Sequence, residues 1–236
     1  MKKAFSLIEL SIVLIIIGLL AAGISGGSSL ISHAKMNSLI KDINSSKFNL
    51  YSFKLTYDQI PGDFNKASAF FNVSSGNGDG SVNTDDELKY AAQHLAKADI
   101  ISNEGYDASS NYAIKINSHS NAGYIYKNLK YSGESSIQIG YYNNAPESAH
   151  IILFANKDSN NSSNYNKAFL KPKELYQIDR KLDDGKPDAG TISYTSYNGS
   201  TNTRSNSSVN KCADSSKYYI SKKDVACNLV IFHPAD

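Results

Sequence analysis

The sequence predicts an α+β protein in which one long N-terminal helix is followed by an antiparallel sheet. An apolar run fills residues 5–24, and apolar residues then recur every three or four positions to about residue 57. Stretches of alternating apolar and polar residues, separated by Gly, Asn and Ser, follow between residues 111 and 156. A helical stem and a sheet-containing head account for these three observations.

The first apolar run has the length and composition of a membrane span. It contains no proline and a single charge, Glu9, and it is preceded by Lys2 and Lys3. About 20 apolar residues let an α-helix cross a bilayer, and flanking lysines favour the cytoplasmic side. We therefore expect a single pass with the rest of the chain outside the cytoplasm.

Glu9 and the length of the apolar run argue against a cleaved signal or a plain membrane anchor. A cleaved secretory signal has an apolar core of about 7–15 residues, shorter than this run, and a lipoprotein signal needs a cysteine that is absent here. A plain anchor gains nothing from a carboxylate, which costs about 2.5–3.5 kcal/mol in a membrane helix. The acid therefore indicates a function or a partner.

The stem is expected to continue beyond the membrane as an amphipathic helix. Gly26 and Gly27 weaken it, and Pro61–Gly62 ends it, so the helix should reach about Tyr57 with its outer half packed on the head. The apolar rhythm comprises Met36, Leu39, Ile40, Ile43, Phe48, Leu50, Tyr51 and Leu55. The alternative is two helices broken at Gly26–Gly27.

The segment KAFSLIELSIVLIIIGLLAAGI resembles the class III signal of type IV pilins and type II secretion pseudopilins. The resemblance implies that a prepilin peptidase cuts between Ala4 and Phe5 and methylates the new Phe5 amine. Glu9 becomes the fifth mature residue and pairs with the Phe5 amine of a neighbouring subunit during assembly. Family members have glycine before the cut, where this chain has Ala4. If Glu9 has no such partner, it lies solvated at the membrane surface.

The resemblance also implies a domain organisation and a location. Residues 1–4 form a leader, 5–24 a transmembrane helix, 25–60 an amphipathic continuation, and 61–236 a periplasmic head. The stem packs on an antiparallel sheet, as in pilins. The chain is then a structural subunit in the bacterial inner membrane, not an enzyme, whose partners are other subunits and the prepilin peptidase. The large head favours a minor or tip subunit over the abundant one.

A loop in the head has the residue types of a calcium site. Its side chains follow an EF-hand-like order, with an acid closing the loop. The candidate ligands are Ser75, Asn77, Asp79, Asn83 and Asp86. The alternative is an Asn/Gly/Asp turn that caps a helix from Asp86 to Ala98, in which His94 is a packed or surface residue rather than a ligand.

The rest of the head is expected to be mostly strands. We predict strands in NYAIKINSH, AGYIYKNLKY, SSIQIGYY and AHIILFAN, the last being the most buried, and a final strand at Cys227–Phe232. A short helix over Leu170–Asp179 lies between them, and residues 193–217, rich in Ser and Asn, are expected to form an exposed loop.

Asp179, Asp183, Asp184 and Asp188 gather around Gly185. In a cleft such acids could perform acid–base chemistry or bind a cation, and a membrane-tethered enzyme is therefore an alternative function. The simpler interpretation is a solvated turn in which Lys181 and Lys186 balance the acids.

The chain's two cysteines, Cys212 and Cys227, are expected to pair, as nearby cysteines outside the cytoplasm usually do. A two-cysteine metal site lacks close partners. The net charge of +2 gives no strong case for nucleic acid. A third function, a tip adhesin or DNA-uptake module, has only YYISKK and YKNLKY as hints of a basic, aromatic surface.

Overall fold

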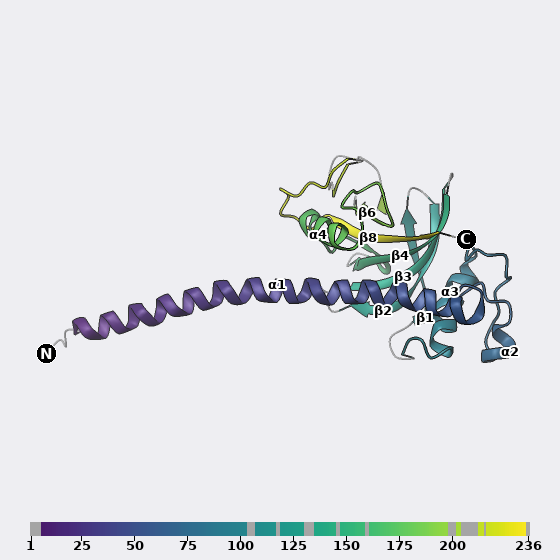
Figure 1. The fold of residues 1–236 in the computed structure, drawn as a ribbon, viewed down its shortest axis with the longest axis horizontal. Coiled ribbons are helices and arrows are strands. Elements are labelled where there is room, and N and C mark those ends of the chain that lie inside the picture. The colour runs from purple at the N-terminus through teal and green to yellow at the C-terminus, as the bar shows by residue number, and fades with distance from the viewer. Residues whose placement is uncertain are drawn as a thin grey trace. The chain divides into compact units, whose positions relative to one another are not determined.

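The computed structural model of the chain describes residues 6–102, 107–116, 119–129, 135–144, 147–158, 161–197, 202–203, 212–214 and 216–234. It divides into two compact units, with the boundary between Asp42 and Ile43. That boundary lies inside helix α1, which runs unbroken from Leu7 to Tyr57 (Figure 1). The continuous helix is therefore confirmed, and Gly26–Gly27 does not interrupt it.

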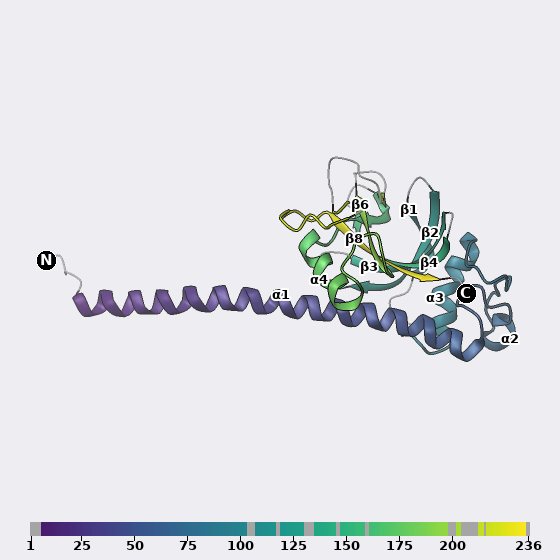
Figure 2. The same cartoon turned by 45° about the horizontal axis from the view of Figure 1, so that its top comes forward.

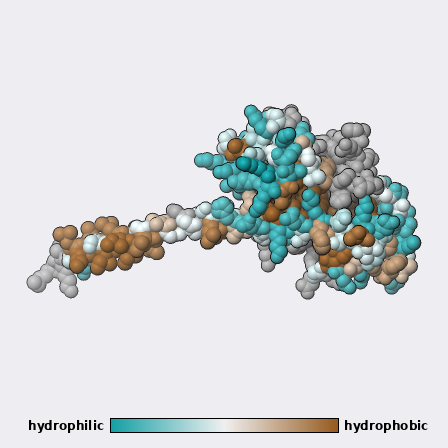
Figure 3. Space-filling model, in the orientation of Figure 1, coloured by the Kyte–Doolittle hydropathy of each residue, from teal (hydrophilic) through white to brown (hydrophobic). Residues whose placement is uncertain are grey.

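The first unit begins with a stretch of α1 whose apolar side chains face outward. Every described residue from Ser6 to Ile24 is exposed, and Figure 3 shows apolar side chains along this end of α1. The helix is long and apolar enough to cross a membrane. Because none of this span is buried within the chain, its apolar surface needs lipid or protein around it.

The second unit begins with the last four turns of α1, which bury one stripe of side chains. Ile43, Leu50 and Phe53 recur at helical spacing and are buried. Phe48, Tyr51 and Leu55 were expected to share in the packing, but they are exposed. They lie on other faces of the helix, so the predicted apolar face is only partly correct.

The head is α+β, with an antiparallel sheet as expected apart from one short parallel pairing. Its helices are α2 (Ala67–Phe71), α3 (Asp85–Lys97) and α4 (Pro172–Leu182). Its strands are β1 (Asp107–Ile116), β2 (His119–Leu129), β3 (Ser135–Asn144), β4 (Glu147–Asp158), β5 (Asn161–Lys167), β6 (Ile192–Tyr197), β7 (Asn202–Thr203) and β8 (Cys227–Pro234).

The strands follow the order β3-β2-β1-β7-β6-β8-β4-β5, and a further β3–β4 pairing closes this order into a ring. The parallel link joins β1 to β7 through Ile116 and Asn202. Helix α3 contacts β1, β2 and β3, whereas α4 contacts β6 and β8 (Figures 1 and 2). The two helices therefore lie on different parts of the ring.

Strand β4 is the centre of the core. In register, Ile152 stands beside Ile139 of β3 and Ile231 of β8, and all three are buried. The opposite face of β4 packs Leu153 and Ala155 with Val230. Residues 152–155 are thus buried on both faces, as expected of AHIILFA, and residues 227–231 of β8 are buried as well.

Two boundaries in the C-terminal part differ from the expectation. The predicted loop at 193–217 begins with strand β6, whose Ser193 and Tyr194 are buried. Ile192 and Tyr194 lie on one face and Ser193 lies on the other, and all three are buried, so the start of this strand packs despite the Ser/Thr-rich composition. The short helix is also displaced, because Pro172 is accommodated in its first turn.

The predicted disulfide is present. Cys212 and Cys227 are bonded, with Cα atoms 5.0 Å apart, and both are fully buried. The bond joins Cys212 to the first residue of β8. It therefore closes the loop between the two cysteines against the core.

We expect the double substitution Cys212→Ala/Cys227→Ala to lower the free energy of unfolding by about 3 kcal/mol, since closing a 15-residue loop restricts the unfolded chain. Urea unfolding of the full chain in detergent measures the change. Reduction of the unchanged chain is the matched control and should produce the same loss. A loss well under 1 kcal/mol in both samples would mean that the loop is held by its other contacts.

Candidate functional site

The N-terminal end of α1 carries the only charged side chain of the apolar span in the described residues. Glu9 is exposed, and its Oε2 accepts a hydrogen bond of 2.9 Å from the backbone N–H of Ser6. Ser6 directly precedes α1, and its Oγ lies 3.4 Å from the Ile8 nitrogen. This is the carboxylate half of a capping box, a role that the Ser-Leu-Ile-Glu spacing could have predicted.

The hydrogen bond fixes where the acid lies in a single chain. Glu9 folds back over the first turn, toward the end of the chain that contains Ala4 and Phe5, which lie outside the described residues. A carboxylate in this position can accept one donor from its own helix and still offer its other oxygen to a second cation. The arrangement therefore suits both local capping and pairing with a neighbour.

Some of the residues predicted to bind calcium form hydrogen bonds with each other and with α2. Asn77 and Asp79 bond to each other, since the Asn77 Nδ2 lies 3.1 Å from an Asp79 oxygen. The Ser75 hydroxyl instead contacts Ser68 at the start of α2. Asn83 and Asp86 are exposed at the approach to α3. Calcium binding by these five candidate ligands stays a prediction.

Asp63, which the sequence interpretation overlooked, holds this loop. Its carboxylate is buried and accepts the backbone N–H groups of Gly78, Asp79 and Gly80 at 2.7–3.1 Å. Burial raises its pKa, and the three N–H groups oppose that rise. Its position directly after Pro61–Gly62 was the available signal.

Glu87 stabilises the other side of the loop in the same way, as an acceptor of backbone hydrogen bonds. It is buried, and its carboxylate accepts the backbone N–H groups of Asn77, Asn83 and Thr84. The Glu87 N–H donates in turn to the Thr84 Oγ1, so α3 begins with a full capping box. The helix-capping turn, which was the alternative to calcium, is therefore present.

His94 is a packed residue, as expected. Its Nδ1 accepts the Gly62 N–H at 3.0 Å, so Nε2 carries the proton and donates to the Ser74 carbonyl at 2.8 Å. Burial lowers its pKa. Both ring nitrogens are used, and the ring joins the turn after α1 to the segment before α3.

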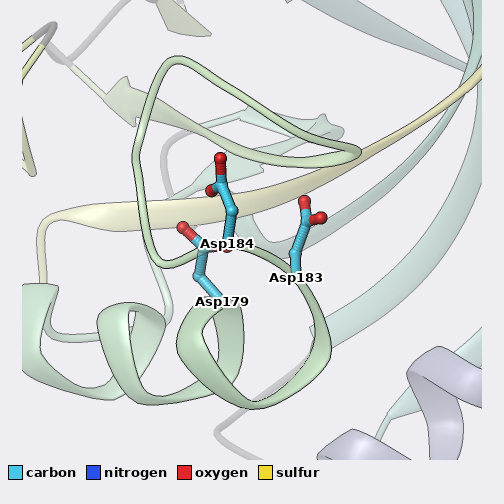
Figure 4. Close-up of side chains that lie close together, drawn as sticks. All are labelled: Asp179, Asp183 and Asp184. Carbon is cyan, nitrogen blue, oxygen red and sulfur yellow. The ribbon is translucent and has the colours of Figure 1, made fainter.

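The acidic segment after α4 is more ordered than a solvated turn. Asp179 is fully buried, whereas Asp188 is exposed. Ligand oxygens of Asp179, Asp183 and Asp184 lie within 4.8 Å of one another, and the carboxylates point away from α4 into the following loop (Figure 4). The expectation of a turn balanced by lysines is wrong for Asp179.

These acids bond to their own surroundings. Asp179 accepts the Tyr218 hydroxyl at 2.7 Å and the Gly185 N–H at 3.2 Å. Asp183 accepts the backbone N–H groups of Thr191 and Ile192 at 2.6 and 2.7 Å. The cluster thus joins α4, the disulfide-bounded loop and the start of β6. The enzyme hypothesis stays open, because the acids do converge.

Burial raises the pKa of Asp179 to about 6, although its bonds to Tyr218 and Gly185 lower it. The ordinary value is 3.8. The folded state therefore binds this proton more tightly than the unfolded state does. The resulting stabilisation is fully present below about pH 4 and is lost as the pH rises through about 6.

Asp179→Asn should remove this part of the pH dependence, because the amide imitates the protonated acid and does not titrate. We expect the variant to lose less stability than the unchanged chain between pH 4 and pH 7 in urea unfolding. Asp188→Asn, an exposed acid in the same segment, is the control and should keep the original slope. An identical slope in Asp179→Asn would show that Asp179 does not titrate in this range.

Comparisons with known proteins find no matching family model, no similar curated protein and no similar solved structure.

Proposed function

We propose that the chain is a structural subunit of a bacterial type IV pilus or type II secretion pseudopilus. A prepilin peptidase would process it between Ala4 and Phe5, and it would polymerise through the N-terminal part of α1. The observation that carries the proposal is an exposed apolar helix with one carboxylate at its first turn, continuous with the first helix of a compact head.

An apolar helix of this kind suits both a bilayer and the core of a helical filament. Both surroundings are apolar, so moving the helix from one to the other changes little apolar exposure. Packing between helices and a small number of polar contacts then decide how they associate. Glu9 is the polar group available for that purpose.

The proposed pairing of Glu9 with the Phe5 amine of a neighbour would set the stagger between subunits. An unpaired charge in a bundle of apolar helices is costly, so a subunit would settle where its acid meets an amine. The bond from Ser6 to Glu9 supports this, since it holds the acid at the end of the helix where the amine would arise.

The location follows from the same features. Lys2 and Lys3 favour a cytoplasmic N-terminus, which would place the head in the periplasm. The disulfide between Cys212 and Cys227 agrees with an oxidising compartment. We therefore propose a single-pass inner-membrane protein before assembly.

Filaments sheared from cells test the proposal. The chain should appear in the sheared fraction of cells with an active prepilin peptidase and should remain in the membrane when the peptidase is absent. Its abundance relative to the main subunit decides between a minor and a repeated role. A chain that stays in the membrane of peptidase-positive, piliated cells contradicts the proposal.

A further inference from the structure

Helix α4 and the disulfide-bounded loop enclose an open groove of about 360 Å³ on the head. Its lining residues are Lys173, Tyr176, Gln177, Arg180, Lys181 and Ile220. Three are cations and none is acidic. Ile220 is 53% exposed, which provides an apolar contact beside the charges. The groove therefore suits an acidic segment that also offers some apolar surface.

The cations of the groove are presented by a helix held firmly in place. Lys173 and Arg180 are seven residues apart, which places them on one face about two turns from each other. On the other face, Leu175 and Ile178 are buried. The hydrogen bond between Asp179 and Tyr218 ties the helix to the loop. Little ordering would be needed for a partner to bind.

The acidic partner surface exists on the same molecule. Residues 58–99, which contain α2 and α3, hold seven acidic and three basic residues. Asp63 and Glu87 are buried within the loop, whereas Asp79 and Asp86 are exposed. We call residues 79–86, in which Asp79, Asn83 and Asp86 are exposed, the acidic turn.

Helices α4 and α3 lie at opposite ends of the head (Figures 1 and 2). The groove is lined by α4, and the acidic turn leads into α3. Helix α4 lies against β6 and β8, and α3, which follows the acidic turn, lies against β1, β2 and β3. One head cannot bring them together. A contact between them therefore requires two copies, and it is heterologous, so it can repeat along an open assembly.

We propose that the groove lined by α4 and Ile220 binds the acidic turn of a second copy of this chain, head to tail. Complementary charge sets the order and orientation of such contacts more than their strength. The inference rests on the proposed function, because a filament is what brings neighbouring heads into contact. It favours a repeated subunit over the single-copy tip position that the size of the head suggests.

Nucleic acid fits the groove less well. The ring of Tyr176 lies 6.0 Å from that of Tyr218, inside the molecule's own aromatic contacts. Stacking platforms for single strands need free aromatic faces beside a basic track. Ile220 at the mouth of the groove suits a peptide side chain better than a base or a phosphate.

Crosslinking of the full-length chain in its own membrane tests the proposal. One copy carries Gln177→Cys in the groove, and a second carries Asn83→Cys in the acidic turn; both positions are exposed. The native cysteines are bonded to each other and buried, so they will not react. A short bismaleimide should give a heterodimer, and a chain with both substitutions should give a ladder.

Charge reversal makes the test specific. Arg180→Glu in the groove should reduce the crosslinked fraction by about tenfold, because like charges then meet. Asp86→Lys in the other copy should restore it. Pairing Gln177→Cys with Lys97→Cys, at the far end of α3, measures random collision. Formation of the Cys212–Cys227 disulfide in every variant shows that the head has folded.

Three results would overturn the inference. They are a crosslink no stronger than the Lys97→Cys control, a crosslink insensitive to Arg180→Glu, and an Arg180→Glu loss that Asp86→Lys does not restore. Retardation of a single-stranded thymidine oligonucleotide, or binding to phosphatidylglycerol vesicles, that Arg180→Glu abolishes in the absence of the crosslink would assign the groove to those polyanions instead.

The crosslinking result can be distinguished from the result of the sheared-filament test of the proposed function. A charge-dependent crosslink between chains that keep an intact leader would support the head contact and contradict the pilin proposal. Processed chains that enter sheared filaments but form no crosslink would support the pilin proposal and contradict the head contact.

Discussion

Phe53→Ala should lower the free energy of unfolding of the chain by about 3–5 kcal/mol, the usual cost of truncating a buried phenylalanine. Phe53 is fully buried in the last turns of α1. Its ring lies 4.6 Å from that of Tyr57, 5.8 Å from that of Phe64 and 6.3 Å from that of Phe71. It also stacks on His94 of α3 at 6.3 Å. The side chain thus joins α1 to the rest of the head.

Phe70→Ala is the matched control, because Phe70 contacts the same cluster but is 63% exposed. It should cost about 1–2 kcal/mol, because its ring contacts Tyr57 and Phe64 but is mostly exposed to solvent. Urea unfolding of the full chain in detergent, followed by tyrosine fluorescence, compares the two. Equal losses would mean that the end of α1 is not part of the cooperative unit of the head.

Glu9→Gln should reduce incorporation of the chain into filaments by a factor on the order of a hundred to a few thousand. Removing one partner of a buried ion pair costs about 3–5 kcal/mol, and each 1.4 kcal/mol corresponds to about tenfold. The substitution is informative because glutamine at this position still completes a capping box with Ser6. It removes the charge and keeps the helix start.

Ser6→Ala is the complementary control, since it keeps the carboxylate and removes the hydroxyl that faces Ile8. We expect near-normal incorporation. Quantification of each variant in sheared filaments against its membrane level gives the comparison. Normal incorporation of Glu9→Gln would mean that the acid acts only as a helix cap.

Helix α1 could be predicted because its signals are local and repeated. The apolar run and the three-to-four-residue rhythm extend to Tyr57, and Pro61 stops them. The face that packs on the head was only partly predictable. Ile43 and Phe48 look equivalent in the sequence, and only the position of the head decides that Ile43 is buried and Phe48 is exposed.

The strands were predicted wherever apolar residues alternate, and missed where the composition is polar. Strand β5 is made of Asn, Ser, Tyr and Lys, and in the part of the chain that the structure describes it pairs with the end of β4. Strand β6 was taken for a loop because Ser and Thr alternate with its buried Ile192 and Tyr194. Pairing with β8 supplies the order that composition does not reveal.

Among the polar residues, some roles could also be predicted from the local sequence and others could not. His94 as a packed residue and the Cys212–Cys227 bond were predictable from residue type and spacing. The bond from Tyr218 to Asp179 was not, because 39 residues separate the two and neither carries a local signal. Asp63 was missed since a single acid in a turn looks like any other surface acid.

Mass spectrometry of the N-terminus of the chain purified from its own cells decides whether the protein is processed as a prepilin. We expect a mature chain that begins at Phe5 with one methyl group on its amine, and no residual Met1–Ala4. An intact leader on the mature protein, in cells that process their other prepilins normally, would contradict it.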